Sequence, residues 1–104
     1  MPFASPEKRE IHFKKHGHKF PAANPIEYEQ MAEAFLYGPM GNDTRECNRN
    51  QSNDRLRFDI LTRFLGVACL HPEFIRTFYP VERSNIAASG GPENYFSYKC
   101  RERP

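Results

Sequence analysis

The sequence predicts an α+β fold with two N-terminal helices packed on a small antiparallel β-sheet. Two segments in the first 30 residues each place a helix-capping residue directly before a proline, which is typical of helix starts. From residue 44 onward, short stretches alternate apolar and polar residues, which is typical of strands. Helices followed by a run of strands indicate an α+β protein.

The composition fits one folded domain over residues 1–104. Hydrophobic residues make up 38% and charged residues 27%, which is too apolar for a chain that is disordered throughout. The formal charge of +2 identifies no partner, but the charges are unevenly distributed. The first 20 residues carry five Lys or Arg against two Glu, whereas residues 25–37 carry three Glu and no Lys or Arg. We therefore expect one basic and one acidic surface.

Cysteine usage and hydropathy limit the class of protein. Cys47, Cys69 and Cys100 are scattered and odd in number, which argues against a disulfide framework and is compatible with a reducing compartment. No two of them have the Cys-x-x-Cys spacing of a zinc site. We expect neither a membrane span nor a signal peptide, because the chain lacks the apolar runs that these need.

A first helix is expected near residues 6–16. Ser5 suits the N-cap, Pro6 suits the first helical position, and Glu7 places a carboxylate in the first turn. Gly17 is a typical residue for the end of this helix. The segment contains few apolar residues, so we expect it to depend on contacts with the rest of the fold.

A second helix is predicted more strongly. Asn24 and Pro25 form its start, and Glu27 completes the capping pattern. The Gly38-Pro39 pair ends it. Its apolar stripe, with the spacing of one helix face, consists of Tyr28, Met31, Ala32 and Phe35.

Three strands are predicted at residues 55–60, 63–70 and 73–80, and their spacing indicates an antiparallel meander. The middle segment is almost entirely apolar, so we expect it at the centre of the sheet. Gly66 within it indicates a bulge or a close approach of another segment. The flanking elements that we expect are a first strand over 44–49, a loop over 81–93 and a last strand over 94–100.

Two arginines in "DRLRFD" are expected on the polar side of their strand. Alternation predicts that Leu56 and Phe58 point to one side of the sheet while Arg55 and Arg57 point to the other. One interpretation of these arginines is an ordinary solvated sheet face. The other is a positive platform for RNA, on which nearby aromatic rings stack bases.

The segment "IRTFYP" supplies polar groups on the following strand. Alternation predicts that Thr77 and Tyr79 share one face and that Arg76 lies on the other. The two hydroxyls suit phosphate oxygens or a ribose, although Thr and Tyr also favour strands for their shape alone. An arginine that faces the core needs an anionic partner, for which Asp59, Glu73 or a bound phosphate are the candidates.

The stretch "IHFKKHGHKF" holds three of the four histidines of the chain. His12 and His16 are four residues apart and share one face of a helix, which suits a metal ion. The neighbouring lysines would repel a dication, and no His-Glu-x-x-His pattern is present. A solvated helix face is a second interpretation. The third is acid–base catalysis on a phosphodiester, since imidazole titrates near neutrality and lysines attract phosphate.

In this order, "HFKKHGHKF", "EYEQMAEAFL", "RLRFD", "LGV" and "IRTFYP" resemble the small C-terminal nuclease domains of bacterial polymorphic toxins. These are the barnase–EndoU–colicin–RelE-like, or BECR, ribonucleases. The resemblance covers roughly residues 11–80, and "NYFSYKC" is similar to the closing segment of the family. It implies a toxin that cleaves RNA without a metal or other cofactor.

The same resemblance implies a biological setting. Such domains act on tRNA or other RNA in the cytoplasm of a neighbouring bacterium, after delivery by a secretion system. A cognate immunity protein covers the active site. Carried over by position, the family's histidine segment falls on His12 and His16, its basic strand residue on Arg57, and its Arg-Thr-aromatic segment on residues 76–79.

The leading hypothesis is therefore an endoribonuclease that acts through attack of the ribose 2′-hydroxyl and leaves a 2′,3′-cyclic phosphate. One histidine would be the base, and the other histidine or Lys15 would protonate the leaving oxygen. The expected catalytic residues are His12, His16, Arg57, Thr77 and Tyr79. The expected substrate-binding residues are Lys15, Arg55 and Arg76, and no residue is assigned to a metal.

Two other functional classes remain open from the sequence. The chain could be a non-catalytic RNA-binding module on the same fold. It could instead be a protein-interaction domain whose acidic helix, with Glu27, Glu29 and Glu33, meets a basic partner. The plain interpretation of that helix is a solvated amphipathic face.

Overall fold

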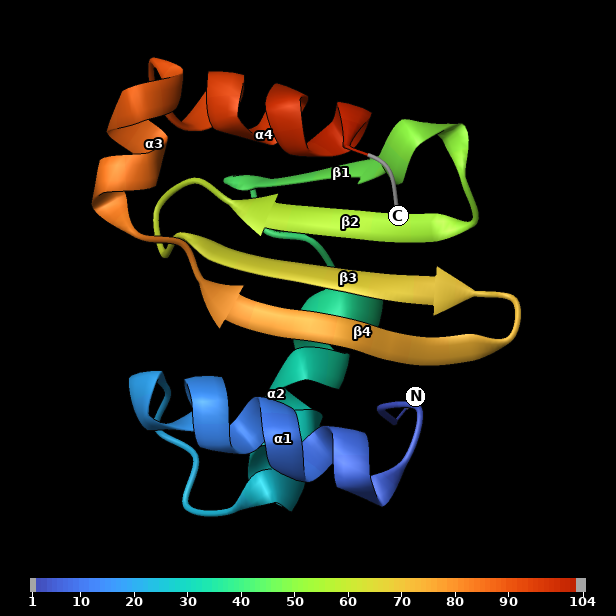
Figure 1. Cartoon of the computed structure of the whole chain (residues 1–104). Coiled ribbons are helices and arrows are strands. Elements are labelled where there is room, and N and C mark those ends of the chain that lie inside the picture. The colour runs from blue at the N-terminus through green and yellow to red at the C-terminus, as the bar shows by residue number, and fades with distance from the viewer. Residues whose placement is uncertain (1, 103–104) are drawn as a thin grey trace.

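Helices, strands and further helices follow one another along residues 2–102, the part of the chain that this computed structural model describes (Figure 1). The predicted α+β fold, with two N-terminal helices and an antiparallel sheet, is confirmed. The helices are α1 (Pro6–His16), α2 (Pro25–Tyr37), α3 (Arg83–Ser89) and α4 (Pro92–Arg101). The strands are β1 (Thr44–Asn48), β2 (Asp54–Asp59), β3 (Phe64–Leu70) and β4 (Glu73–Pro80).

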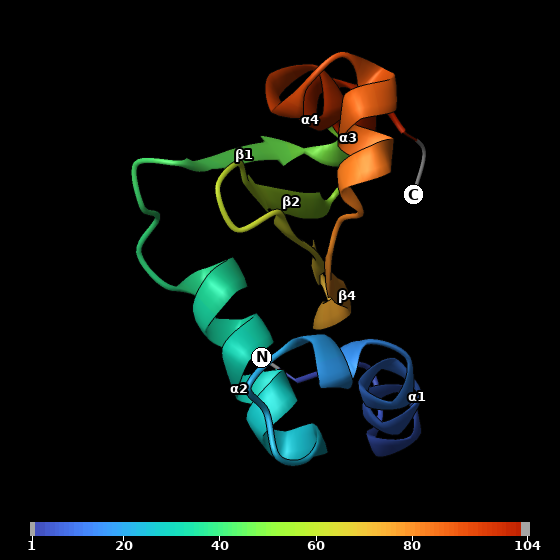
Figure 2. The same ribbon diagram turned by 90° about the vertical axis from the view of Figure 1, so that its left-hand side faces the viewer.

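The four strands form one sheet in the order β1-β2-β3-β4, and each neighbouring pair is antiparallel. The predicted meander and the predicted first strand are therefore confirmed. Helix α2 covers one face of the sheet, while α3 and α4 cover the other face near β1 and β2 (Figure 2). Helix α1 lies beside the β4 edge, on the same side as the C-terminal helices (Figures 1 and 2).

Each face of the sheet has its own hydrophobic core. On the α2 face, Tyr28 and Leu36 pack against Phe78 of β4. On the opposite face, Phe58 of β2 packs against Tyr95 of α4, with ring centroids 5.5 Å apart. The sheet is thus covered on both faces, with the β4 end of the second face bordered by α1.

The helix starts form as predicted. The Ser5 side chain accepts a hydrogen bond from the Lys8 backbone N–H at 3.1 Å, and the Asn24 side chain accepts one from the Glu27 N–H at 2.9 Å. Both bonds satisfy backbone donors that a helix leaves without partners in its first turn. In residues 2–102, none of the helices combines the length and the apolar character that a membrane crossing requires.

Gly66 marks a close approach. A Cβ atom at this position would lie 3.0 Å from the side chain of Leu36, so the absence of a side chain lets α2 pack tightly on β3. The bulge lies elsewhere in the sheet. Val67 pairs with Thr77 and Ala68 pairs with Ile75, which leaves Arg76 as an extra residue in β4.

The C-terminal prediction was wrong. Residues 81–93 were expected as a loop and 94–100 as a strand, but α3 and α4 occupy them. Gly90 ends α3 in the left-handed conformation with φ of 96°, and Pro92 begins α4 at a first helical position. A seven-residue stretch rich in Tyr and Phe fits the spacing of a helix as well as that of a strand. The proline just before it favours a helix and was the signal that could have decided between the two.

The inference from the cysteine count was also wrong. Cys47 in β1 and Cys100 in α4 form a disulfide, with Cα atoms 6.2 Å apart, and Cys69 is a buried free thiol. An odd number of cysteines excludes a complete set of pairs but not a single pair. The partners are 53 residues apart, and α4 reaches Cys47 because it folds back over the sheet beside β1 (Figure 1).

We expect reduction of the Cys47–Cys100 bond to lower the free energy of unfolding by about 2–4 kcal/mol, because the bond restricts a long loop of the unfolded chain. Urea denaturation with and without reductant measures this difference. A Cys47→Ser/Cys100→Ser variant is the control, and its urea midpoint should equal that of the reduced protein in both conditions. An unchanged midpoint after full reduction would contradict the expectation.

Candidate active site

The N-terminal segment fixes α1 beside β4. The Ile75 N–H donates to the Pro2 carbonyl at 3.0 Å, which makes a parallel bridge between residues 3 and 75. Glu29 of α2 is buried, and it accepts hydrogen bonds from the Phe3 backbone N–H at 2.9 Å and from Arg9 Nη1 at 3.3 Å. Glu29 therefore joins α1 to α2 inside the protein and is not part of a solvated acidic face.

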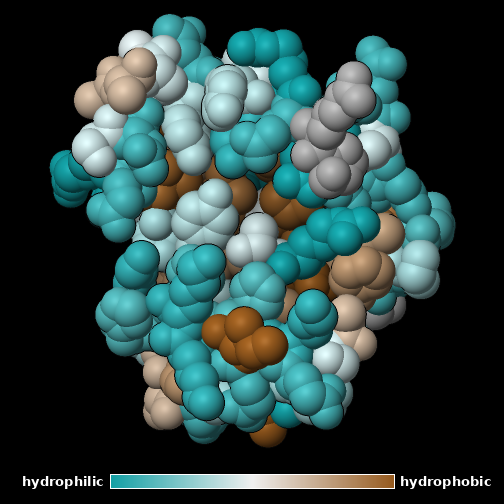
Figure 3. Space-filling model, in the orientation of Figure 1, coloured by the Kyte–Doolittle hydropathy of each residue, from teal (hydrophilic) through white to brown (hydrophobic). Residues whose placement is uncertain are grey.

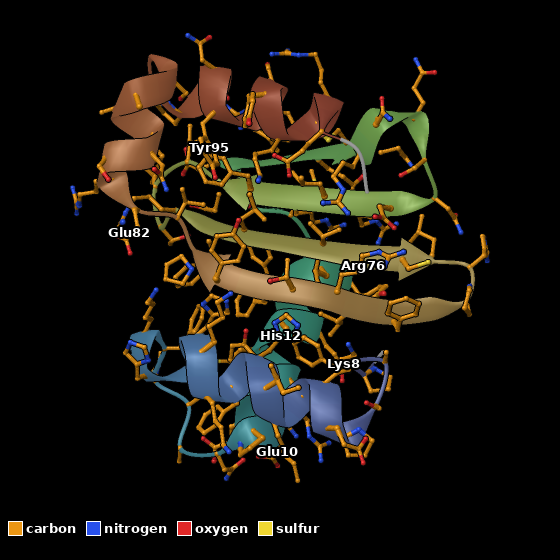
Figure 4. The ribbon with its side chains drawn as sticks, in the orientation of Figure 1. Lys8, Glu10, His12, Arg76, Glu82 and Tyr95 are labelled. Carbon is orange, nitrogen blue, oxygen red and sulfur yellow. A yellow bond between two sulfur atoms is a disulfide. The ribbon has the colours of Figure 1, made fainter. Side chains whose placement is uncertain are left out.

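His12 and His16 both lie on the side of α1 that meets β4. The His12 ring stacks on Phe3 with centroids 5.0 Å apart, and the His16 ring stacks on Tyr79 of β4 at 5.2 Å. The two imidazoles are 6.3 Å apart. Figure 4 shows His12 pointing from α1 toward β4. The prediction that His12 and His16 share one face of the helix is confirmed. That face lies against β4, the strand that carries Thr77 and Tyr79.

Both imidazoles are neutral at neutral pH. Burial, together with the charges of Lys19 and Lys15, lowers the pKa of His16 from its ordinary value of 6.5 to about 4, and burial is the largest of these causes. Burial also lowers the pKa of His12, with added effects of Lys15 and Lys8. The Nδ1 atoms of both rings are buried without a hydrogen-bond partner. Each ring can therefore accept a proton, and neither is a ready proton donor.

The bulge puts Arg76 on the same face of β4 as Thr77 and Tyr79. Thr77 lies opposite Val67 and Tyr79 lies opposite Leu65, and both partners belong to the core beneath α4. The guanidinium of Arg76 reaches Asp54 on that face at 3.0 Å. Simple alternation had placed Arg76 on the other face with a core partner, and this was wrong because one extra residue shifts the register.

Tyr79 also contacts the C-terminal helix. Its side chain packs against the core that contains Tyr95 of α4. Burial raises the pKa of Tyr95, and the neighbouring Tyr79 raises it further. Tyr79 is thus held between His16 of α1 and Tyr95 of α4.

A cleft of about 320 Å³ opens where α1 meets β4. Its volume is at the lower end of the range for small-ligand pockets. Lys8 and Arg76 supply positive charge, His12 supplies a proton acceptor, and Phe74 supplies an apolar wall. Figure 4 shows the labelled members of this set on the two sides of the cleft. In the space-filling view, hydrophobic residues are visible between the upper and lower parts of the molecule, and one more is exposed on the otherwise hydrophilic lower surface (Figure 3).

Arg55 and Arg57 are on the opposite face of the sheet, against α2. Arg57 is buried and donates from Nη1 to the Phe35 carbonyl at 3.1 Å and to the Gly38 carbonyl at 2.7 Å. Arg55 donates to the Leu36 carbonyl at 3.1 Å. Both therefore satisfy carbonyls at the C-terminal end of α2. The structure does not bring them to His12, so the single catalytic set predicted from the sequence is divided between two faces.

Lys15 is exposed on α1 and close enough to both histidines for its charge to lower their pKa values. It does not line the cleft, and its predicted role in substrate binding stays a prediction. In residues 2–102, no group of three or more His, Cys, Asp or Glu side chains is arranged to hold a metal ion.

Sequence reasoning missed Lys8, Phe74 and Asp54. Lys8 precedes His12 by one helical turn, and that spacing was the available signal. Asp54 lies two residues before the core residue Leu56 and therefore on the same face of the strand, so a buried carboxylate could have been expected from "DRLRFD". For Phe74 the available signal was alternation, which places residues 74 and 76 on the same face of the strand, as the structure shows.

Comparison of the chain with models of known protein families and with curated proteins finds no match. The family resemblance of the sequence motifs therefore stays a prediction.

The His16 pKa predicts how stability depends on pH. Below pH 6.5 the unfolded chain takes up a proton that folded His16 does not, so the stabilisation from neutral His16 is complete above about pH 6.5 and is lost progressively toward pH 4. A His16→Phe variant keeps an aromatic ring but no titration. We expect it to lose less stability than the wild type between pH 7 and pH 4.5 in urea denaturation.

The matched control for this experiment is His18→Gln, since His18 is exposed on the turn that follows α1. Its pH dependence should equal that of the wild type. Equal loss of stability in the wild type and His16→Phe would show that His16 is not buried in its neutral form.

Proposed function

We propose that the protein is an endoribonuclease that needs no metal and leaves a 2′,3′-cyclic phosphate. The observation that supports this most is that His12, Arg76 and Lys8 line one cleft. Transfer of a phosphodiester to the neighbouring 2′-hydroxyl needs a proton acceptor beside cationic groups that bind the phosphate. The cleft offers both, together with an apolar wall for a base.

His12 is the proposed general base. Burial and two nearby lysines keep its imidazole neutral, and it lines the cleft where a ribose hydroxyl would lie. Deprotonation by His12 lets the 2′-oxygen attack the adjacent phosphorus atom and expel the 5′-oxygen of the next nucleotide. His16 is more deeply buried and stacks on Tyr79, so its proposed role is to hold that residue.

The negative charge that develops on the phosphate is stabilised from β4 and α1. Arg76 carries the charge-assisted donors, and the hydroxyls of Thr77 and Tyr79 are further donors on the same face. The leaving oxygen needs a proton that neither histidine holds at neutral pH. Lys15 is the proposed donor, since it is an exposed ammonium group on the same helix whose charge acts on both imidazoles.

Binding of RNA combines charge and stacking. Lys8, Lys15 and Lys19 follow one another along α1 and its C-terminal turn, so the affinity for phosphate should fall with salt. Phe74 in the cleft offers a ring for a nucleobase. DNA lacks the 2′-hydroxyl nucleophile and would not be cleaved.

The resemblance to BECR toxins extends this proposal. It supports tRNA as the target class, action in the cytoplasm of another bacterium, and a cognate immunity protein that binds over the cleft. The alternative of a non-catalytic RNA-binding module is favoured by one observation: His16 is buried and stacked like a core residue.

Incubation of the purified protein with total bacterial RNA in excess EDTA tests the proposal. We expect discrete fragments that end in 2′,3′-cyclic phosphate, and a loss of about 100-fold or more in rate for His12→Ala. His18→Ala is the control and should cleave like the wild type. Intact RNA with the folded wild-type protein would refute catalysis, and binding without cleavage would favour the alternative.

A further inference from the structure

We infer that Asp54 is a positioning residue that holds Arg76 in place for a phosphate of RNA, and that Arg49 keeps this arrangement positive. The inference rests on the proposed function, and it adds Asp54 and Arg49, two residues that do not line the cleft. Asp54 begins β2 and its side chain is 3% exposed, whereas the Arg76 side chain is 40% exposed. The carboxylate is thus internal, and the guanidinium that it binds reaches the surface.

Two contacts fix the guanidinium of Arg76. Its Nε donates to Asp54 Oδ1 at 3.0 Å, and its Cζ lies 5.0 Å from the centre of the Phe74 ring. Within residues 2–102 its side chain makes no other hydrogen bond, ion pair or ring contact, and the bond to Asp54 does not use the two terminal amino groups. Those amino groups form one edge of a planar fork, which is the edge that binds phosphate oxygens in pairs. Since Arg76 lines the cleft, the fork is available to an anion there.

A single Asp–Arg pair would be neutral and would attract an anion weakly. Here Asp54 has a second partner, because its Oδ2 accepts a hydrogen bond from Arg49 Nη2 at 2.7 Å. Two guanidinium groups therefore share one carboxylate, and the set of three carries a net charge of +1. Arg49 lies in the short turn after β1, so it contributes to the charge at the cleft without lining it.

The bond to Asp54 restricts the rotamers that Arg76 can adopt. A long exposed side chain loses rotamer freedom when it binds, and prior fixation lowers that cost. A buried carboxylate anchored on both oxygens is a rigid acceptor, because it cannot turn away from one arginine without breaking its bond to the other. The bulge at Arg76 directs the side chain toward this acceptor.

The test uses a fluorescent single-stranded RNA with every 2′-hydroxyl methylated, which can bind but cannot be cleaved by the proposed reaction. Fluorescence anisotropy gives its affinity at several salt concentrations. Removal of a carboxylate near a cationic site should strengthen RNA binding by charge alone. We expect Asp54→Asn to weaken it by about threefold or more, because the fork of Arg76 is released.

Asp43→Asn is the matched control, since it removes one carboxylate just before β1, at the far edge of the sheet from β4. It should bind RNA as tightly as the wild type or slightly more tightly. The Nε–Hε signal of Arg76 in a 15N NMR spectrum is a second readout. We expect it to be distinct in the wild type and to move toward the position of a free arginine in Asp54→Asn.

A second pair of variants decides the case even if Asp54→Asn does not fold. Arg49→Gln should weaken RNA binding more than Arg45→Gln, which removes one positive charge from a surface pair with Glu93. Equal effects of these two variants, or equal affinities of Asp54→Asn and Asp43→Asn, would overturn the inference.

Arg76→Ala separates this inference from the proposed function. We expect it to weaken binding by about tenfold and to reduce the salt dependence by about one phosphate contact. If Arg76→Ala weakens binding while the Asp54 and Arg49 variants match their controls, the RNA site stands and the positioning role fails. If Arg76→Ala has no effect, the cleft does not bind RNA and both proposals fail.

Discussion

One extra residue in β4 determines which side chains face the candidate site. Arg76 has no partner in β3, so the alternation of the strand is shifted at that point. Ile75 and Phe78 consequently both enter the core beneath α2, while Arg76, Thr77 and Tyr79 all face the other side. A regular strand would place Arg76 among the aromatic rings of the core, away from water and from Asp54. The cleft depends on this bulge.

The two faces of the sheet use their positive charges differently. On the α2 face, Arg55 and Arg57 bind carbonyls at the end of a helix, and their donors are occupied within the protein. On the other face, Arg76 is held by a carboxylate at one edge and leaves its other edge open. The sequence alone does not show which of these arginines is available to a ligand. In the structure, Arg76 keeps terminal N–H donors without a partner, whereas Arg55 and Arg57 use theirs on backbone carbonyls. Free donors beside a neutral imidazole make the face with Arg76 the candidate for phosphate chemistry.

Local chemistry in the sequence predicted the starts of the two N-terminal helices, the four strands of the sheet and the shared face of the two histidines, but it also predicted a fifth strand where α4 lies. Caps such as Ser5 and Asn24 act within one turn, so they can be recognised without knowledge of the fold. The features that were missed join distant residues. The Cys47–Cys100 bond and the contact between Asp54 and the bulged strand depend on how β1, β2, β4 and α4 come together, whereas the C-terminal helix was missed although Pro92 gave a local signal for it. Short periodic patterns carry no information about such pairings.

If RNA binds on the face of the sheet between α1 and α4, NMR mapping with the 2′-O-methylated RNA will show it directly. Backbone and side-chain signals are followed as the oligonucleotide is added. We expect shifts at His12, Arg76 and Thr77, with little change at Arg55 and Arg57 against α2. Shifts confined to the α2 face, or no saturable shift at His12 and Arg76, would contradict this expectation.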